Sequence, residues 1–216
     1  MSETIGAEHK FHDEGFAMGL ADRFMPTPDR LELFNLILSE LKSRISPSGC
    51  VVELGIGPGF LADHVLSVMP EIRYYGVDFS GPMLDLAQKR LRPYSTRVAY
   101  VQAELVNDSW WADLPTPVSA IISTWALHDL GSQENVEVVY RSCAEILRDG
   151  GILLNGDFIK PNLTRYEYEP GRFKIAKHIE ILRRVGFEIA VCLEVFEEEI
   201  ESPTAAQNYA CVRAIQ

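Results

Sequence analysis

The sequence has no long apolar run, few cysteines and few basic side chains. No stretch approaches the roughly 18 uninterrupted apolar residues of a membrane-spanning helix. The cysteines are widely separated and lie in apolar segments, which excludes a disulfide framework and a zinc spacing and indicates small core residues. They are Cys50, Cys143, Cys192 and Cys211. The net charge of -11, without a run of Lys and Arg, disfavours nucleic acid as a partner.

The first residues also lack the features of a targeting segment. Met1 to Thr4 is polar and acidic, with neither the basic start nor the apolar core of a signal peptide, so we expect a cytoplasmic protein without a membrane partner. Residues 1–28 mix aromatic and charged side chains without a clean period, and we expect an N-terminal arm or lid. An arm of this length could exchange between subunits, so the sequence is compatible with a monomer and with a homodimer. His9 and His12 do not have the i, i+4 spacing of a helical ligand pair, so we expect no metal.

A chain of 216 residues with 47% apolar content fits one domain with a sizeable core, and we place that domain at residues 29–216. Apolar runs of strand length alternate with apolar residues at helical spacing, which predicts a doubly wound α/β sheet with helices on both faces. We expect a mostly parallel, seven-stranded sheet whose last two strands, joined by an acidic loop, are antiparallel. The expected strands cover residues 50–54, 72–77, 98–102, 118–123, 152–154, 189–196 and 208–214.

A short stretch after the first expected strand indicates where a ligand binds. The run 50–54 is apolar and rich in β-branched residues, as in a central parallel strand. Gly55, Gly57 and Gly59 then allow a sharp turn and a close approach of the backbone to a ligand. A helix begins at Phe60, and its free N–H groups point back at the turn. A nicotinamide or flavin fingerprint has the spacing G-x-G-x-x-G, which would place its third small residue at position 60. Phe60 therefore weakens a dinucleotide interpretation.

An acidic residue follows the second expected strand. Asp78 lies 23 positions after Gly55, where a carboxylate can accept hydrogen bonds from the ribose hydroxyls of an adenosine bound over the glycine turn. Nicotinamide-binding proteins share this feature. It therefore predicts a nucleoside ligand without identifying it.

Four short motifs follow one another in a specific order. They are Glu53-Leu54-Gly55-Ile56-Gly57-Pro58-Gly59, then Val77-Asp78-Phe79-Ser80 with Met83, then Trp125-Ala126-Leu127-His128-Asp129-Leu130, and finally Leu147-Arg148-Asp149-Gly150-Gly151. In this combination the chain resembles the class I S-adenosylmethionine-dependent methyltransferases over roughly residues 30–214. The resemblance implies a Rossmann-like methyltransferase fold, S-adenosylmethionine as cofactor and transfer of a methyl group to a small-molecule acceptor.

The resemblance also implies roles for individual residues. Glu53 would lie near the ammonium group of the cofactor, Asp78 would hold the ribose hydroxyls, and Glu104 would accept a hydrogen bond from the adenine amine. The family often has Gly-Asp where this chain has Gln102-Ala103-Glu104, so the side chain that meets the adenine stays open. The implied cofactor-binding set is Glu53, Gly55, Ile56, Gly57, Gly59, Asp78, Phe79, Met83, Ala103, Glu104, Ser123, Thr124 and Trp125. Ordinary helix-cap packing is the alternative for Phe79 and Met83.

Methyl transfer by in-line displacement depends mainly on positioning, and a base helps when the acceptor is a hydroxyl or a carbon acid. His128 is the candidate base, and a pocket wall that hydrogen-bonds nearby backbone is an equally good interpretation. We expect the arm, Trp110 and Trp111, and the polar segment 155–173 to cover the acceptor.

Two arginines of that segment, Arg165 and Arg172, would suit an anionic group on the acceptor, with plain loop surface as the alternative. Two other functions compete with methyl transfer. One is a catalytically inactive cofactor-binding partner or sensor. The other is an NAD-dependent oxidoreductase.

Overall fold

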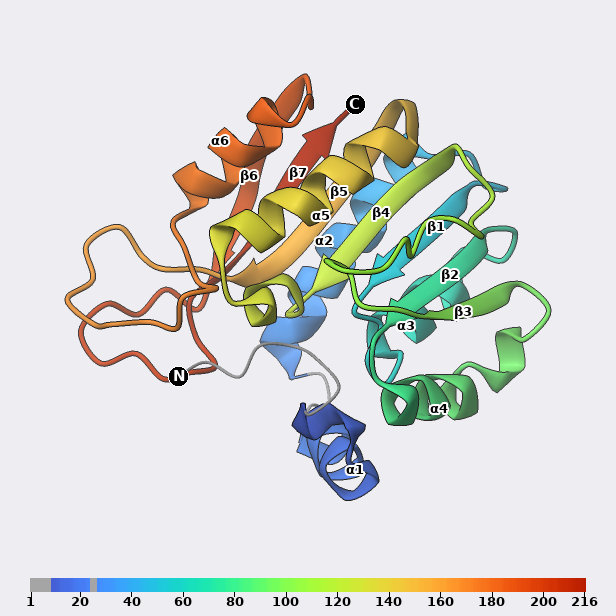
Figure 1. The fold of residues 1–216 in the computed structure, drawn as a ribbon, viewed down its shortest axis with the longest axis horizontal. Helices are drawn as coiled ribbons and strands as arrows, with labels where there is room; N and C mark the ends of the chain where they lie inside the picture. Colours follow the sequence, from blue (N-terminus) through green and yellow to red (C-terminus); the bar gives the residue numbers. More distant parts are fainter. Residues whose placement is uncertain (1–8, 24–26) are drawn as a thin grey trace.

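The computed structural model describes residues 9–23 and 27–216. Its centre is a seven-stranded sheet with the order β3-β2-β1-β4-β5-β7-β6 (Figure 1). The first five strands are parallel, and β7 pairs antiparallel with both β5 and β6, as the sequence predicts. The strands are β1 Cys50–Leu54, β2 Arg73–Asp78, β3 Val98–Gln102, β4 Val118–Thr124, β5 Leu147–Phe158, β6 Ile189–Phe196 and β7 Tyr209–Ile215.

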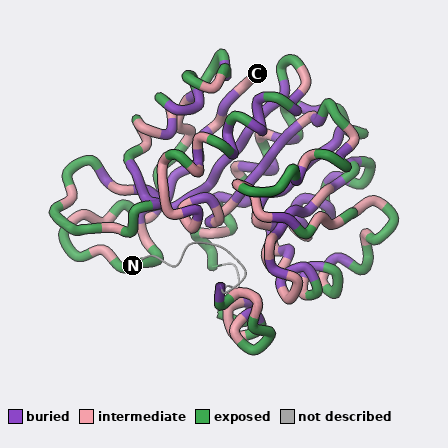
Figure 2. The backbone as a smooth tube through the Cα atoms, in the orientation of Figure 1, coloured by how far each residue is buried: buried purple, intermediate pink, exposed green. Residues whose placement is uncertain are grey.

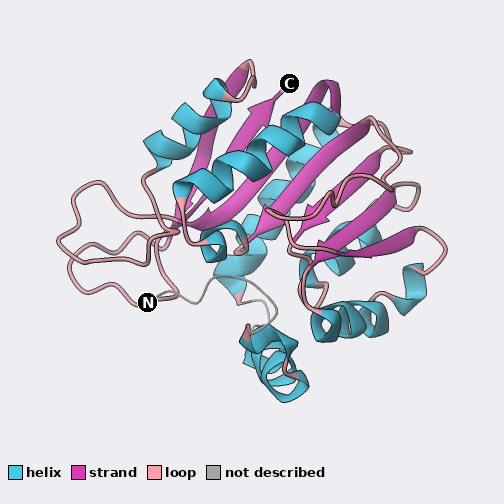
Figure 3. Cartoon of the chain, viewed as in Figure 1, coloured by secondary structure: helices cyan, strands magenta, loops and turns pink. Residues whose placement is uncertain are grey.

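Helices cover both faces of the sheet (Figure 3). Side chains of α2, α3 and α4 form one hydrophobic core with one face, and those of α5 and α6 form a second core with the other. The longer helices are α1 Glu14–Arg23, α2 Pro28–Arg44, α3 Phe60–Val68, α4 Gly81–Arg90, α5 Gln133–Ile146 and α6 Ile175–Arg184. Three-residue or four-residue 3-10 turns are η1 Lys10–His12, η2 Arg92–Tyr94 and η3 Leu127–Leu130.

The central strands are buried on both faces because each face carries a layer of helices (Figure 2). In β1, Val51 joins the core under α2 and α3, whereas Val52 and Leu54 join the core under α5. This alternation explains why the strand reads as a continuous apolar run. Of the four cysteines, Cys192 is only half-buried in β6, so the prediction of a core residue is wrong there.

Strand β5 is longer than the sequence pattern predicts. Its Asn155 to Phe158 portion was expected to belong to a polar covering segment, but these residues are buried and pair with β7. The amide nitrogen of Asn155 has a partner inside the sheet, since it donates to the Tyr140 hydroxyl at 3.0 Å, whereas its Oδ1 is buried without a hydrogen-bond partner among the described residues. This correction moves Asp157 from a loop to the carboxyl end of a buried strand.

The described part of the N-terminal arm is helical and lies outside the sheet. Both η1 and α1 contact α4, and α1 sits beyond the carboxyl ends of the parallel strands in Figure 1. Residues 1–8 and 24–26 of the predicted arm lie outside the described residues. Within the part of the chain that the structure describes, no helix has the length and apolar character to cross a membrane.

Candidate active site

The glycine turn after β1 has the backbone that the sequence predicts. The φ angles are 68° at Gly55, 51° at Gly57 and 80° at Gly59, a region of backbone conformation that residues with a Cβ rarely adopt. A Cβ on Gly55 would lie 2.4 Å from the Cβ of Ala126, whereas a Cβ on Gly57 would meet nothing within 4 Å. Gly55 is therefore required by packing, and Gly57 faces open space.

That open space is a cavity at the carboxyl ends of the strands, with about 1210 Å³ of empty volume that is partly open to solvent. Its position follows the rule that open α/β sheets bind ligands outside the carboxyl ends of their strands. Most of the residues named from the sequence line it. They are Glu53, Gly55, Ile56, Gly57, Asp78, Phe79, Met83, Ala103, Thr124, Trp125 and His128.

Three members of the implied cofactor set do not line the cavity. Gly59 packs against α4, and Ser123 donates its hydroxyl to the Leu54 carbonyl at 2.9 Å. These two residues support the turn and the β1–β4 pair. Glu104 accepts a hydrogen bond from Asn107 at 2.7 Å, while its neighbours in sequence line the cavity. Its contact with an adenine stays a prediction.

The tryptophan pair does not cover the cavity. Trp110 is only 1% exposed and belongs to the core on the α5 side of the sheet. Trp111 packs edge-on against it with ring centroids 5.5 Å apart. Their predicted role in acceptor recognition is therefore wrong, because the apolar core holds both rings away from the site.

Asp78 ties the glycine turn to the end of β2. Its Oδ2 accepts from the Gly57 N–H at 2.8 Å, and its Oδ1 accepts from the Ser80 N–H at 2.9 Å. Burial raises the pKa of the carboxyl group to about 6, although both backbone donors oppose the shift. A carboxylate has about four acceptor positions, so it can also accept from the ribose hydroxyls.

Glu53 is a second buried carboxyl group at the edge of the cavity. It is 1% exposed and accepts a hydrogen bond from the Tyr74 hydroxyl at 2.6 Å. Burial raises its pKa to about 8, so the free protein holds this group neutral at pH 7. A cationic ligand group beside it would favour the ionised form.

The arm covers the side of the cavity at which Phe79 lies. The ring centroid of Phe79 is 5.5 Å from that of His9, 5.9 Å from that of Phe11 and 5.2 Å from that of His12. The Ser80 hydroxyl donates to the Phe11 carbonyl, and Phe11 itself lines the cavity. The described part of the arm thus borders the cavity, and its action as a lid stays a prediction.

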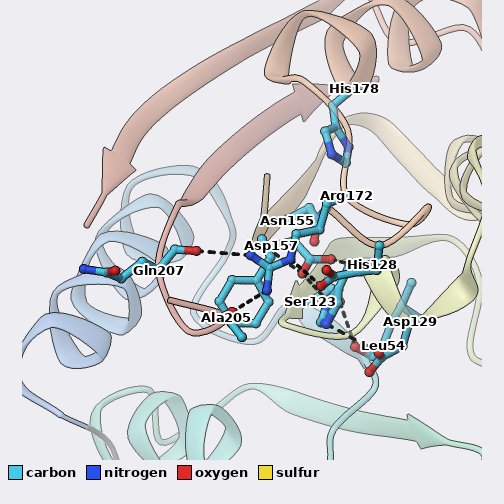
Figure 4. Close-up of polar contacts among 12 residues, drawn as sticks. Leu54, Ser123, His128, Asp129, Asn155, Asp157, Arg172, His178, Ala205 and Gln207 are labelled. Atoms are coloured by element: carbon cyan, nitrogen blue, oxygen red, sulfur yellow. Dashed lines mark hydrogen bonds and ion pairs between the residues drawn. The ribbon is translucent and has the colours of Figure 1, made fainter. Parts of the chain in front are cut away.

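His128 is held by a carboxylate that the sequence reasoning missed. Asp157 Oδ1 lies 2.7 Å from the His128 Nδ1, and Oδ2 accepts from the His128 backbone N–H at 2.9 Å (Figure 4). Burial disfavours the charged imidazole, but Asp157 and then Asp129 raise the pKa of His128 above 6.5. Burial likewise disfavours the Asp157 carboxylate, yet His128 holds its pKa below 3.8. With Nδ1–H bound to the carboxylate, the neutral ring carries its lone pair on Nε2.

A signal for Asp157 was present in the sequence. It stands at the end of the fifth strand, and the parallel neighbour of that strand ends beside His128. Carboxyl ends of neighbouring parallel strands meet at one edge, where functional side chains gather. Ending the strand at Leu154 concealed this relationship.

Arg172 is not available to an acceptor. The side chain is 3% exposed, with its guanidinium 4.1 Å from the centroid of the Phe158 ring. It donates to Glu169 and to the carbonyls of Ala205 and Gln207, so it links the segment between β5 and α6 to the loop between β6 and β7 (Figure 4). Arg165 is exposed and does not line the cavity. The predicted anion-binding role is therefore wrong for Arg172 and unsupported for Arg165.

Among residues 9–23 and 27–216, no group of three or more His, Cys, Asp or Glu side chains could hold a metal ion.

The chain is similar in sequence to known methyltransferases. A family model described as a methyltransferase domain matches residues 51–151, the stretch from β1 into β5. An uncharacterised methyltransferase from Anoxybacillus flavithermus is 30% identical over 59% of this chain and 56% of its own length. Another from Oceanobacillus iheyensis is 25% identical over 73% of this chain and 64% of its own length. The chain thus spans less than two thirds of these relatives.

Solved methyltransferase structures have a similar fold. The N-methyltransferase NodS from Bradyrhizobium japonicum, solved with S-adenosyl-L-homocysteine, superposes with a TM-score of 0.66 at 18% identity and covers 90% of both chains. The antiparallel end of the sheet and the methyltransferase-domain match over residues 51–151 therefore agree with the resemblance of this chain to the class I S-adenosylmethionine-dependent methyltransferases.

Proposed function

We propose that this protein transfers a methyl group from S-adenosylmethionine to a small-molecule acceptor, with His128 as general base. The observation that carries the proposal is the His128–Asp157 pair: His128 lines the same cavity as the glycine turn and Asp78, and the buried Asp157 contacts its imidazole. A base held by a buried carboxylate and facing a ligand cavity is suited to proton removal.

The residues fit the cofactor. The open side of Gly57 lets a ligand approach the backbone, Asp78 has acceptor capacity for two hydroxyl groups, and Phe79 and Met83 give an apolar border to a flat ring. Glu53 is a buried carboxyl group whose partner is only a hydroxyl, so it would gain from an ammonium group nearby. When bound, S-adenosylmethionine supplies a methyl group already activated by a sulfonium.

The chain's own residues would then place and deprotonate the acceptor. Thr124 and Trp125 at the end of β4 line the cavity next to the turn, and His128 follows in η3. Asp157 keeps the imidazole in one orientation and favours its protonated form. The arm and the walls of the cavity would exclude water during transfer. The limited volume of the cavity favours a small acceptor.

Methyl transfer with a labelled methyl group on S-adenosylmethionine tests this proposal. The purified protein would be offered small hydroxyl, thiol and amine compounds, and His128→Ala would be compared with the unchanged protein. We expect turnover to fall by roughly 10²- to 10⁴-fold in the variant while S-adenosylhomocysteine still binds. Loss of cofactor affinity in His128→Ala would make the residue structural. Binding without turnover of any acceptor would favour an inactive cofactor-binding protein.

A further inference from the structure

One part of the cavity has a wall of aromatic rings. Phe34 of α2 lies 5.9 Å from Trp125 between ring centroids, and Trp125 lies 6.5 Å from Phe158. Phe158 meets the imidazole of His128 edge-on at 5.0 Å. All four residues line the cavity, and Leu20 of α1 closes it with another apolar side chain. Such a wall suits a flat apolar molecule and would bring it next to His128.

Apart from His128, the ionisable side chains that line the cavity are carboxylic acids. They are Glu53, Asp78 and Asp129, and the described lining includes no Lys or Arg. Glu53 and Asp78 belong to the cofactor side, at the ends of β1 and β2. Asp129 lies on the acceptor side: its Oδ1 is 3.4 Å from Nε2 of His128, and its side chain is 37% exposed.

The nearby arginines do not reverse this charge. Arg172 is occupied by Glu169 and two carbonyl groups. Arg30 lies over the Trp125 ring at 5.3 Å and is not part of the cavity lining. His9 and Lys10 of the arm also act electrostatically on Asp129, but neither is part of the described lining. An anionic acceptor would therefore face Asp129 without a lining cation, and Asp157 already neutralises a protonated His128. The carboxylate of Asp129 would repel an anion placed beside His128.

We propose that the acceptor is an uncharged, apolar aromatic compound that presents a hydroxyl group to His128, and that Asp129 excludes anionic acceptors. This inference rests on the proposed methyltransferase function. An amine would pair with Asp129 as an ammonium, which has no lone pair to attack with, whereas a hydroxyl needs a base as its oxygen attacks.

The transfer step balances with these residues. The acceptor oxygen forms the new bond to the methyl carbon, and the bond from that carbon to the cofactor sulfur breaks with its electron pair left on sulfur. The hydroxyl proton passes to Nε2 of His128, and Asp157 stabilises the imidazolium that results. Asp129 takes no part in the bond changes and acts on which molecule enters.

Two compounds of similar size and shape test the charge selection by direct binding. We would titrate 2-naphthol and 2-naphthoate into the protein saturated with S-adenosylhomocysteine at pH 7.5, using calorimetry. We expect naphthol to bind at least tenfold more tightly than naphthoate. In Asp129→Asn, naphthoate affinity should rise at least tenfold while naphthol affinity stays within twofold. Asp113→Asn, which removes an exposed acidic charge outside the lining, should change neither value.

Several outcomes would overturn the inference. Equal affinity for the two compounds, or no response of naphthoate to Asp129→Asn in a variant that melts like the unchanged protein, removes the role of Asp129. No binding of naphthol, or methyl transfer to 2-naphthylmethylamine in preference to naphthol, removes the hydroxyl class. Failure of S-adenosylhomocysteine to bind at all would be seen first, and it would overturn the proposed function and this inference together.

Discussion

One carboxylate fixes His128 at two points: Asp157 contacts the ring Nδ1 at 2.7 Å and the backbone N–H of the same residue at 2.9 Å. Asp157 comes from β5 and His128 from η3, so the pair joins two elements at the edge of the cavity. The double contact sets the orientation of the ring and the nitrogen that carries its proton. It also predicts how the imidazole titrates.

Replacing Asp157 with Asn should lower the pKa of His128. The amide keeps the size of the side chain but removes the negative charge that raises the pKa of the imidazole above 6.5. NMR titration of histidine-labelled protein would show the shift directly. His64, which pairs with Asn35 away from this carboxylate, is the internal control and should titrate unchanged. An unchanged His128 titration would mean that the ion pair does not exist in solution.

The same pair predicts the pH dependence of methyl transfer. His128 must be neutral to accept a proton, so kcat/KM should rise as pH increases through the pKa of the imidazole, above 6.5. In Asp157→Asn the rising limb should move to lower pH, because the imidazole loses its proton more easily. Steady-state rates measured from about pH 5.5 to about pH 9, a range that brackets the usual histidine pKa, test this. A rising limb at the same pH in both proteins would argue against His128 as the base.

Cofactor binding should release a proton from Glu53. This group has a pKa of about 8 in the free protein, so it is protonated at pH 7, and an ammonium placed beside it would drive its ionisation. Asp78, with a pKa of about 6, is already mostly ionised at that pH. We expect release of about one proton at pH 7. Calorimetric titration with S-adenosylhomocysteine in phosphate and in Tris measures the release from the difference in heat, and Glu53→Gln should abolish it. Equal heats for the unchanged protein would contradict this role.

Gly57 and Gly150 offer a matched pair for the backbone argument. Both have a positive φ, 51° and 68°, and a Cβ on either would meet nothing within 4 Å. Alanine should therefore cost each position about 1–2 kcal/mol of unfolding free energy. Of these two glycines, Gly57 lines the cavity and Gly150 does not. Gly57→Ala should therefore weaken S-adenosylhomocysteine binding by at least tenfold, and Gly150→Ala should leave it unchanged. Chemical denaturation and calorimetry give both quantities. Equal cofactor affinity in the two variants would place the ligand elsewhere.

Much of the fold could be predicted because its signals are local. The buried face of α2 follows from the helical spacing of residues such as Phe34, Ile37 and Leu41, which are all buried. The caps Thr27, Ser80 and Ser132 accept from backbone N–H groups at the helix starts, as their residue types indicate. The glycine turn was equally visible, because three closely spaced glycines imply a backbone that other residues disfavour.

Contacts between distant segments could not be predicted in the same way. The polar end of β5 looked like a loop because nothing in its own sequence shows that Asn155 meets Tyr140, and the place of Asp157 at the end of a strand was missed with it. The aromatic arm had no clean period, since its rings face Phe79 on another element. Arg172 looked like an anion-binding residue, and only the folded chain shows the carbonyl groups that occupy it.

The most direct test of the account is calorimetric titration of the purified protein with S-adenosylmethionine and S-adenosylhomocysteine, with Asp78→Ala as the variant. Asp85→Ala, which changes an exposed aspartate on α4, is the control. We predict micromolar binding of both compounds, weakened by about 1–3 kcal/mol in Asp78→Ala and unchanged in Asp85→Ala. No binding of either compound to the unchanged protein, or equal binding by a folded Asp78→Ala variant, would contradict the assignment of the glycine turn as a methyl-donor site.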